Sequence, residues 1–119
     1  MKRPITAEQV LDEHPELSRS GNEEDFLKSY REDSFILMPD EVRRGLGEIR
    51  DCFRALQQRL PNARFTYKVR IVEQDVGLVE WSADSDTNTV TDGADSYVIR
   101  DGYIRAQTIH YTLVPKKNS

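Results

Sequence analysis

The sequence predicts a single α+β domain in which three N-terminal helices pack on one face of a mostly antiparallel sheet. The 119 residues are enough for one hydrophobic core and too few for two. Apolar residues recur at helical spacing as far as Leu60, whereas the chain from Arg64 onward is rich in Val, Ile, Thr and Tyr. We therefore expect one domain over residues 1–119, with tails at 1–4 and 116–119.

Capping residues predict where two helices begin. Thr6 and Gln9 have the spacing of a capping box, in which a hydroxyl and an amide satisfy each other's backbone donors. Pro15 falls inside this helix and predicts a kink or a split there, because proline removes one helical hydrogen bond. Asn22 is a good N-cap for a second helix over residues 22–30, with three acidic residues in its first turn.

The remaining elements follow from periodicity and turn residues. A short buried strand is expected over residues 34–38, and a third helix over 46–60, where Leu46, Ile49, Phe53, Leu56 and Leu60 recur at helical spacing. Later strands are expected over 65–72, 77–84, 89–100 and 103–114. Asp92-Gly93 lies inside the third of these and predicts a bulge or bend.

The turn at Asp101-Gly102 predicts which side chains share a face of the sheet. A two-residue loop pairs Arg100 with Tyr103, because Asp and Gly both tolerate positive φ. Continued without interruption, this register places one set of residues on a common face: Asp95, Tyr97, Ile99, Ile104, Ala106, Thr108 and His110. The opposite face would then carry an apolar and aromatic patch: Val98, Tyr103, Ile109 and Tyr111.

Parts of the sequence are similar to the SnoaL-like (nuclear transport factor two-like) family. These are YREDSFILMPD from Tyr30, RGLGEIRDCF from Arg44, and GADSYVIRDGYI from Gly93. The resemblance implies a strongly curved, cone-like sheet of the cystatin-like kind, with helices closing an apolar cavity on its concave side. It also implies homodimers through the outer sheet face. Function stays open, because the family includes isomerases, cyclases, hydrolases, dehydratases and non-catalytic binding proteins.

The resemblance also implies places for site residues. His14 takes the place of a tyrosine that donates a hydrogen bond in the family's isomerases, and Asp95 takes the place of their oxyanion-binding aspartic acid. Met38 stands where the isomerases keep the carboxylate that shuttles the proton. A thioether cannot abstract a proton, which argues against ketosteroid-isomerase chemistry by that route. Thr108 stands where related polyketide cyclases carry an acidic residue.

The candidate catalytic residues are therefore Asp95, His110 and His14. If Asp95 points into the cavity, the expected register brings His110 beside it, and an Asp–His couple is suited to acid–base catalysis. A satisfied structural pair is the alternative. The side chains expected to contact a ligand are aromatic, apolar or neutral: Tyr30, Met38, Phe53, Trp81, Tyr97 and Thr108. For the aromatic residues Tyr30, Trp81 and Tyr97, packing in the core is the alternative.

Several classes of function are disfavoured. The net charge of −4 opposes binding to nucleic acid or to an anionic membrane. The single cysteine, Cys52, excludes an intrachain disulfide. No stretch approaches the length of a membrane span, and no signal peptide is recognised, so a cytoplasmic protein is expected. No metal-ligand spacing or phosphate-binding loop is present, which predicts neither metal nor cofactor.

Two hypotheses about function remain. The first is a small-molecule pocket protein, one form of which is an enzyme of the isomerase, lyase or cyclase kind that acts on a hydrophobic carbonyl compound. The second is a non-catalytic, homodimeric module that binds a ligand or a protein. A large cavity with convergent polar groups would favour the first.

Overall fold

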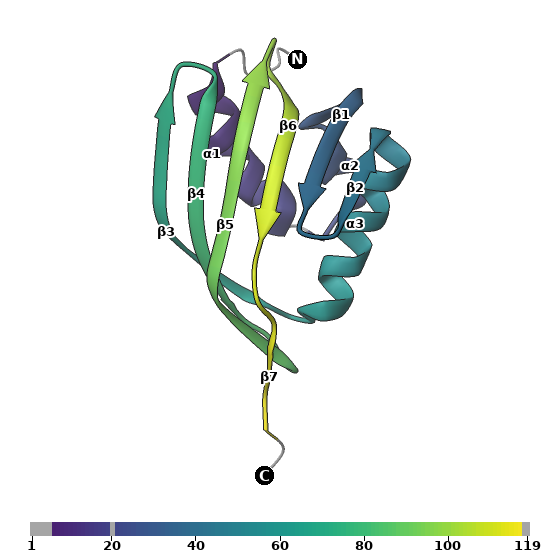
Figure 1. The fold of residues 1–119 in the computed structure, drawn as a ribbon, viewed down its shortest axis with the longest axis vertical. Coiled ribbons are helices and arrows are strands. Elements are labelled where there is room, and N and C mark those ends of the chain that lie inside the picture. Colours follow the sequence, from purple (N-terminus) through teal and green to yellow (C-terminus); the bar gives the residue numbers. More distant parts are fainter. Residues whose placement is uncertain (1–5, 20, 118–119) are drawn as a thin grey trace.

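The protein is an α+β domain with a curved, open sheet and helices on one side of it (Figure 1). The structure is a computed structural model that describes residues 6–19 and 21–117. Its helices are α1 (Ala7–Arg19), α2 (Glu23–Leu27) and α3 (Gly45–Arg59). Its strands are β1 (Tyr30–Met38), β2 (Glu41–Arg44), β3 (Arg64–Glu73), β4 (Val76–Asp84), β5 (Asn88–Arg100), β6 (Tyr103–His110) and β7 (Val114–Pro115).

The helices begin as the sequence predicts and differ in length and placement. The capping box is confirmed, because Gln9 N donates to Thr6 Oγ1 and Thr6 N donates to Gln9 Oε1, both at 3.1 Å. Of the kink or split predicted at Pro15, the split is wrong, since α1 continues through Pro15, with His14 buried just before it. The second helix is shorter than predicted: Asn22 caps it, and it ends at Leu27.

The expectation of three N-terminal helices is correct only in part. Only α1 and α2 precede the sheet, because the chain forms β1 and β2 before it reaches α3. Tyr30, which was expected at the end of the second helix, instead begins β1. The strand β2 was not predicted; its four residues, three of them charged around one valine, are too few to be distinguished from a loop.

The sheet has the order β2-β1-β6-β5-β4-β3, and β7 pairs with β5. All neighbouring strands are antiparallel except β1 and β6, which are parallel, so the prediction of a mostly antiparallel sheet is confirmed. In Figure 1, α1 lies behind β4 and β5, and α3 lies beside β1 and β2. The hydrophobic core lies between these helices and the sheet.

The expected C-terminal tail at 116–119 is wrong at its first residue. Lys116 N donates to the carbonyl of Thr87, and its ammonium group lies 2.7 Å from a carboxylate oxygen of Asp84. The expected tail at residues 1–4 lies outside the described residues, as do residues 118 and 119.

Bulges in β5 and β6 determine which side chains of these two strands face the helices. The one expected near Asp92-Gly93 is confirmed: Trp81 pairs with Gly93 and Ala83 with Val90, so β5 has one residue more than β4 between these pairs. The other was not predicted. Ile99 pairs with Ile104, but Val98 pairs with Ala106, which leaves Arg105 as an extra residue in β6.

Because of the bulge at Arg105, part of the set of residues predicted to share a face with Asp95 is wrong. The two-residue turn is confirmed, since Arg100 pairs with Tyr103 and both Asp101 and Gly102 have positive φ. Beyond Arg105, however, each residue of β6 points to the opposite side from the one predicted. Gln107 and Ile109 therefore face the helices, whereas Thr108 and His110 are exposed on the outer face.

The predicted outer patch changes for the same reason. Ile109 is buried on the inner side. Tyr111 contacts the Trp81 ring at 5.7 Å, and its hydroxyl accepts a hydrogen bond from Arg59. Of the four residues expected on the outer face, Val98 and Tyr103 remain there.

Candidate functional site

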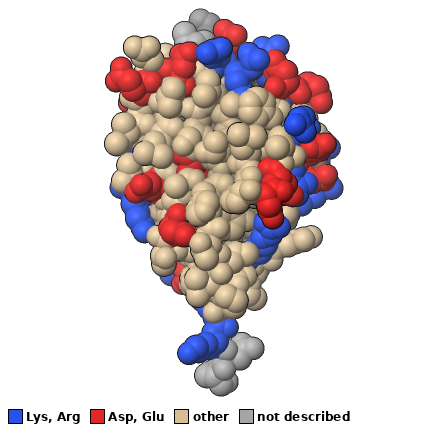
Figure 2. Space-filling model, in the orientation of Figure 1, with Lys and Arg blue, Asp and Glu red and all other residues tan. Residues whose placement is uncertain are grey.

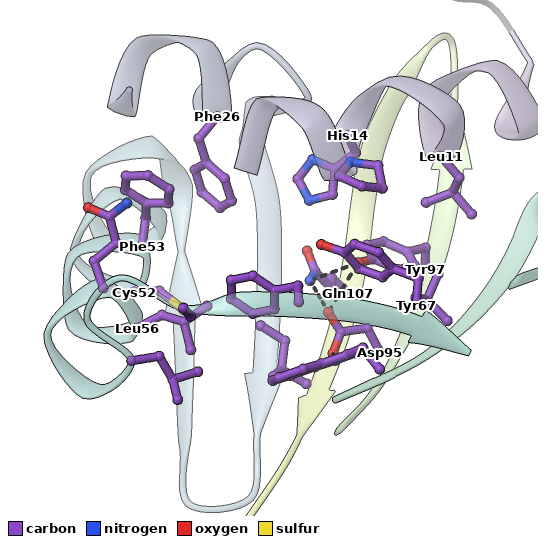
Figure 3. A pocket seen from close by; sticks show the side chains of 18 of the residues that line it. Leu11, His14, Phe26, Cys52, Phe53, Leu56, Tyr67, Asp95, Tyr97 and Gln107 are labelled. Carbon is purple, nitrogen blue, oxygen red and sulfur yellow. Dashed lines mark hydrogen bonds between the residues drawn. The ribbon is translucent and has the colours of Figure 1, made fainter. Parts of the chain in front are cut away.

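A cavity of about 640 Å³ lies between the helices and the inner face of the sheet (Figure 3). Its lining comes from all three helices, the connection after α3, and strands β3 to β6: Leu11, His14, Pro15, Phe26, Cys52, Phe53, Leu56, Gln57, Leu60, Pro61, Asn62, Ala63, Phe65, Tyr67, Val79, Trp81, Asp95, Tyr97, Gln107 and Ile109. Most of these side chains are apolar or aromatic. A cavity of this size and lining is typical of a site for a small organic molecule.

Asp95 is the carboxyl group of this cavity, and three side chains donate hydrogen bonds to it. Trp81 Nε1 donates to Oδ1 at 3.0 Å. Tyr97 OH and Gln107 Nε2 donate to Oδ2 at 3.1 and 3.2 Å. Burial raises the pKa of Asp95 to about 6, although the three hydrogen bonds act in the opposite direction. A carboxyl group with this pKa is able to take up and release a proton near neutral pH.

The polar contacts continue from Asp95 towards α1. Gln107 Oε1 accepts from Tyr30 OH at 2.5 Å, and that hydroxyl lies 3.4 Å from His14 Nε2. His14 Nδ1 lies 3.0 Å from Ser29 Oγ. In Figure 3, His14 points from α1 towards Tyr97 and Gln107, with Asp95 on the far side of Gln107. The polar side chains thus form one connected group in a largely apolar space.

Burial sets the protonation of the other titratable groups in this part of the cavity. It lowers the pKa of His14 to about 4, so the ring is neutral at pH 7. Burial, followed by the nearby charge of Asp95, raises the pKa of Tyr30 and Tyr97 well above the usual range. Both phenols therefore keep their protons and act as donors.

Five of the nine predicted site residues line the cavity: His14, Phe53, Trp81, Asp95 and Tyr97. Tyr30 lies one hydrogen bond away from it, through Gln107. Met38 does not line this cavity. Its sulfur lies 4.0 Å from the Cys52 sulfur, and it lines a much smaller pocket with Ile109 and Tyr111.

The predicted contact between Asp95 and His110 is wrong. His110 pairs with Ala94 on the outer face, where it is exposed. Thr108 is exposed on the same face, and its hydroxyl accepts from Ser96 N at 3.3 Å. Both errors have one cause, the extra residue at Arg105, which turns each later side chain of β6 to the other side.

Gln107 is a polar residue of the cavity that the sequence analysis missed. The uninterrupted register placed it on the outer face, whereas it is 4% exposed and contacts Asp95, Tyr97 and Tyr30. Neither glycine nor proline marks the bulge at Arg105, so the sequence has no local signal for it. The aromatic residues Phe65 and Tyr67 of β3 were also missed; their alternation along the strand was the available signal.

The described part of the chain contains no group of three or more His, Cys, Asp or Glu residues arranged to hold a metal ion. Among the described residues that line the cavity there is no Lys or Arg. No described helix is both long and apolar enough to span a bilayer.

Helices folded over a curved sheet, with a polar group at the base of an apolar cavity, define the class of cystatin-like α+β pocket proteins. The SnoaL-like domain model matches residues 11–107, and the chain belongs to this family. No curated protein matches the chain.

Solved structures share the fold at low sequence identity. An NTF2-like protein of unknown function from Cytophaga hutchinsonii is 14% identical with a TM-score of 0.76, over 94% of this chain and 95% of that one. A putative polyketide cyclase from Sinorhizobium meliloti is 14% identical with a TM-score of 0.72, over 85% and 93%. The epoxide hydrolase/cyclase-like enzyme SalBIII, described in pyran ring formation in salinomycin, is 14% identical with a TM-score of 0.76, over 89% and 90%.

Proposed function

We propose that this protein is an enzyme that moves a proton on an uncharged, hydrophobic carbonyl compound, with Asp95 as the acid–base group. One observation carries the proposal: a carboxyl group whose pKa is raised to about 6 lies in an apolar cavity of about 640 Å³. Isomerases, lyases and cyclases that work on carbonyl compounds share one step, the removal of a proton from the carbon beside the carbonyl group. Such a carboxyl group is suited to this step. The cyclase-like structural neighbours are consistent with this class.

In the proposed step, Asp95 removes a proton from the carbon beside the carbonyl group. The electron pair of the C–H bond forms an enolate, and the proton on Asp95 then returns to the product or to a leaving group. The absence of Lys and Arg among the described lining residues favours an uncharged ligand over an anionic one. His14 remains a proposed site residue as a neutral contact on the helix side. His110, on the outer face, has no part in the proposal.

The experiment is proton exchange on bound ligands. Hydrophobic aromatic and polycyclic ketones are first selected by the increase in melting temperature that they cause. Exchange of their α-hydrogens for deuterium is then followed by NMR in D₂O. We expect Asp95→Asn to bind the selected ketones and to reduce exchange by roughly 10²-fold or more, the usual contribution of general acid–base catalysis. Asp75→Asn, an exposed carboxyl change in the turn before β4, is the matched control.

The alternative is a non-catalytic binding module, and the outer face of the sheet favours its dimeric form. Ligand binding by the wild-type protein without any α-hydrogen exchange would support this alternative and overturn the enzyme proposal. An absence of binding by every ketone tested would overturn the proposed ligand class.

We also propose that the chain forms a homodimer through the outer face. An uncharged row of side chains crosses six strands of the sheet: Ile71, Leu78, Ser96, Thr108, Leu37 and Val42, each paired with the next. Four of these are large exposed hydrophobic residues. Figure 2, which views this face, shows a broad uncharged centre with most charges around the rim. An uncharged face that carries four large exposed hydrophobic residues is typical of an interface.

A further inference from the structure

The hydrogen bonds between α1 and Asp95 have a single consistent direction. We propose that Gln107 and Tyr30 are positioning residues for Asp95, and that they act in an ordered chain of donors that begins at Ser29, passes through His14, and ends at the Asp95 carboxylate. The chain fixes neutral His14 as the tautomer that carries its proton on Nε2. The positioning role rests on the proposed function, whereas the order of donors does not.

The direction of the hydrogen bonds is determined by Asp95, where the chain of donors ends. A carboxylate only accepts hydrogen bonds, so Gln107 presents its NH₂ group to it, with Nε2 3.2 Å from Oδ2. The amide oxygen of Gln107 consequently faces Tyr30, whose hydroxyl donates to it at 2.5 Å. If the Gln107 amide were reversed, two acceptor oxygens would face each other at Asp95.

The Tyr30 hydroxyl has one hydrogen, and Gln107 takes it. At the 3.4 Å contact between Tyr30 OH and His14 Nε2, the hydroxyl oxygen must therefore accept and the ring nitrogen must donate. A neutral imidazole carries only one proton, so Nδ1 accepts, and Ser29 Oγ, 3.0 Å away, donates to it. Burial keeps the ring neutral by lowering its pKa to about 4.

The chain leaves the two carboxylate oxygens unequal. Oδ2 accepts from both Tyr97 and Gln107, whereas Oδ1 accepts from Trp81. Oδ1 is therefore the oxygen with more remaining capacity to accept the proton of a substrate. Four titratable groups that face Asp95 from the packed elements are neutral at pH 7: His14 on α1, Tyr30 on β1, Cys52 on α3 and Tyr97 on β5. Tyr67 on β3 lines the same cavity.

The first test is the tautomer of His14. Long-range ¹H–¹⁵N spectra at pH 7 report which ring nitrogen is protonated, and exposed His110, the other histidine, is an internal reference. We expect His14 to be protonated on Nε2. In Gln107→Leu, the Tyr30 hydroxyl has lost its acceptor and donates to Nε2 instead, so we expect His14 to become protonated on Nδ1. Tyr103→Phe, on the other side of the sheet, is the control and should change nothing.

Protonation on Nδ1 in the wild-type protein would overturn the inference, and this measurement requires no variant to fold. A folded Gln107→Leu protein whose His14 keeps its proton on Nε2 would overturn it as well.

The second test measures the proton affinity of Asp95. Trp81 is the only tryptophan, and its indole donates to Asp95, so its fluorescence should follow the titration of that carboxyl group. We expect a wild-type midpoint near the pKa of about 6. Gln107→Leu and Tyr30→Phe should both raise it, the former by about one pH unit, a tenfold increase in proton affinity, because a hydrogen bond to the charged form is lost. An unchanged midpoint in both variants would overturn the positioning role.

These outcomes are separate from those of the proposed function. If α-hydrogen exchange fails while the tautomer and the midpoint behave as expected, the enzyme proposal falls and the donor chain stands. If His14 has the other tautomer while exchange depends on Asp95, the donor chain falls and the enzyme proposal stands.

Discussion

Asp95 is the residue at which burial and hydrogen bonding oppose each other. Its carboxyl group lines an apolar cavity, which favours the neutral acid, while Trp81, Tyr97 and Gln107 donate to it and favour the anion. Burial has the larger effect, so the pKa rises from 3.8 to about 6. Above pH 6 the folded protein therefore contains a carboxylate that would be more stable in water.

This raised pKa predicts how stability depends on pH. Between about pH 4 and 6 the folded state holds a proton on Asp95 that the unfolded state has released, so stability falls as pH rises. We expect the free energy of unfolding of the wild-type protein, relative to Asp95→Asn, to decrease by at most about 3 kcal/mol from pH 4 to pH 7. Urea denaturation of both proteins at each pH measures it. A difference that increases with pH would show that hydrogen bonding has the larger effect.

Gly93 is the residue that allows Trp81 to reach Asp95. A Cβ atom at this position would lie 2.3 Å from two atoms of the indole ring, so the ring has to lie flat against the backbone of β5. Its Nε1 atom then donates to Asp95. The lack of a side chain at Gly93 is thus linked to the proton affinity of Asp95, two residues further along β5.

We expect Gly93→Ala to displace the indole ring and to destabilise the protein by about 1–3 kcal/mol, the usual cost of overpacking. The fluorescence of Trp81 should change in the folded state, and denaturation should give the loss of stability. Gly47→Ala is the matched control, because nothing lies within 4 Å of its added Cβ and it stands in helix α3. It should be neutral or slightly stabilising. An unchanged spectrum for Gly93→Ala would contradict the close approach.

At the scale of the elements, the β5–β6 hairpin determines the composition of the site. Its turn places Asp101 and Gly102 at φ values of 56° and 79°, which fixes the pairing of Arg100 with Tyr103. After the next pair, Ile99 with Ile104, the bulge at Arg105 shifts the register by one residue. Arg105 also forms an ion pair with Asp33 at 3.0 Å, so the extra residue is held against β1.

We expect Gly102→Ala to cost about 1–2 kcal/mol, because an L-residue is strained at positive φ. Asp101→Gly should be tolerated, since it relieves the same strain at the neighbouring position. Chemical denaturation of the two variants measures the difference. Equal stability of Gly102→Ala and the wild type would show that the turn adopts another conformation.

This hairpin also shows how far the sequence predicts the site. Turn residues have recognisable backbone preferences, so the Arg100–Tyr103 pair and the bulge near Asp92-Gly93 were predicted correctly. At the other bulge, Arg105 contacts Asp33 of β1, about 70 residues earlier in the chain, and no local pattern encodes such a contact. The sequence therefore placed Asp95 and Tyr97 correctly, exchanged Gln107 for Thr108, and put His110 on the wrong face.

At the scale of the whole molecule, the two faces of the sheet have different characters. The inner face carries the polar chain and the cavity, and the outer face carries the uncharged row from Ile71 to Val42. Beyond the bulge, the side chains of β6 alternate between the two faces: Gln107 and Ile109 line the cavity, and Thr108 belongs to the uncharged row. The register of one strand determines both surfaces.

We expect the protein to sediment as a dimer at tens of micromolar, and Leu78→Glu to shift it towards the monomer. The added charge would lie between Ile71 and Ser96 in the uncharged row, where its burial on association is costly. Val114→Glu, which adds the same charge at an exposed hydrophobic residue of β7, is the control and should leave the dimer intact. A wild-type monomer in analytical ultracentrifugation would contradict the proposed interface.

The parallel pairing of β1 with β6 has a consequence for the order of events during synthesis. Tyr30 pairs with Ile104, so β1 emerges from the ribosome long before the strand that completes its hydrogen bonding. Until then one edge of the β1–β2 hairpin has unsatisfied backbone groups, which are prone to join other chains. Contacts between residues so distant in sequence also form slowly. The polar chain that requires both Tyr30 and Gln107 is therefore among the last parts of the molecule to assemble.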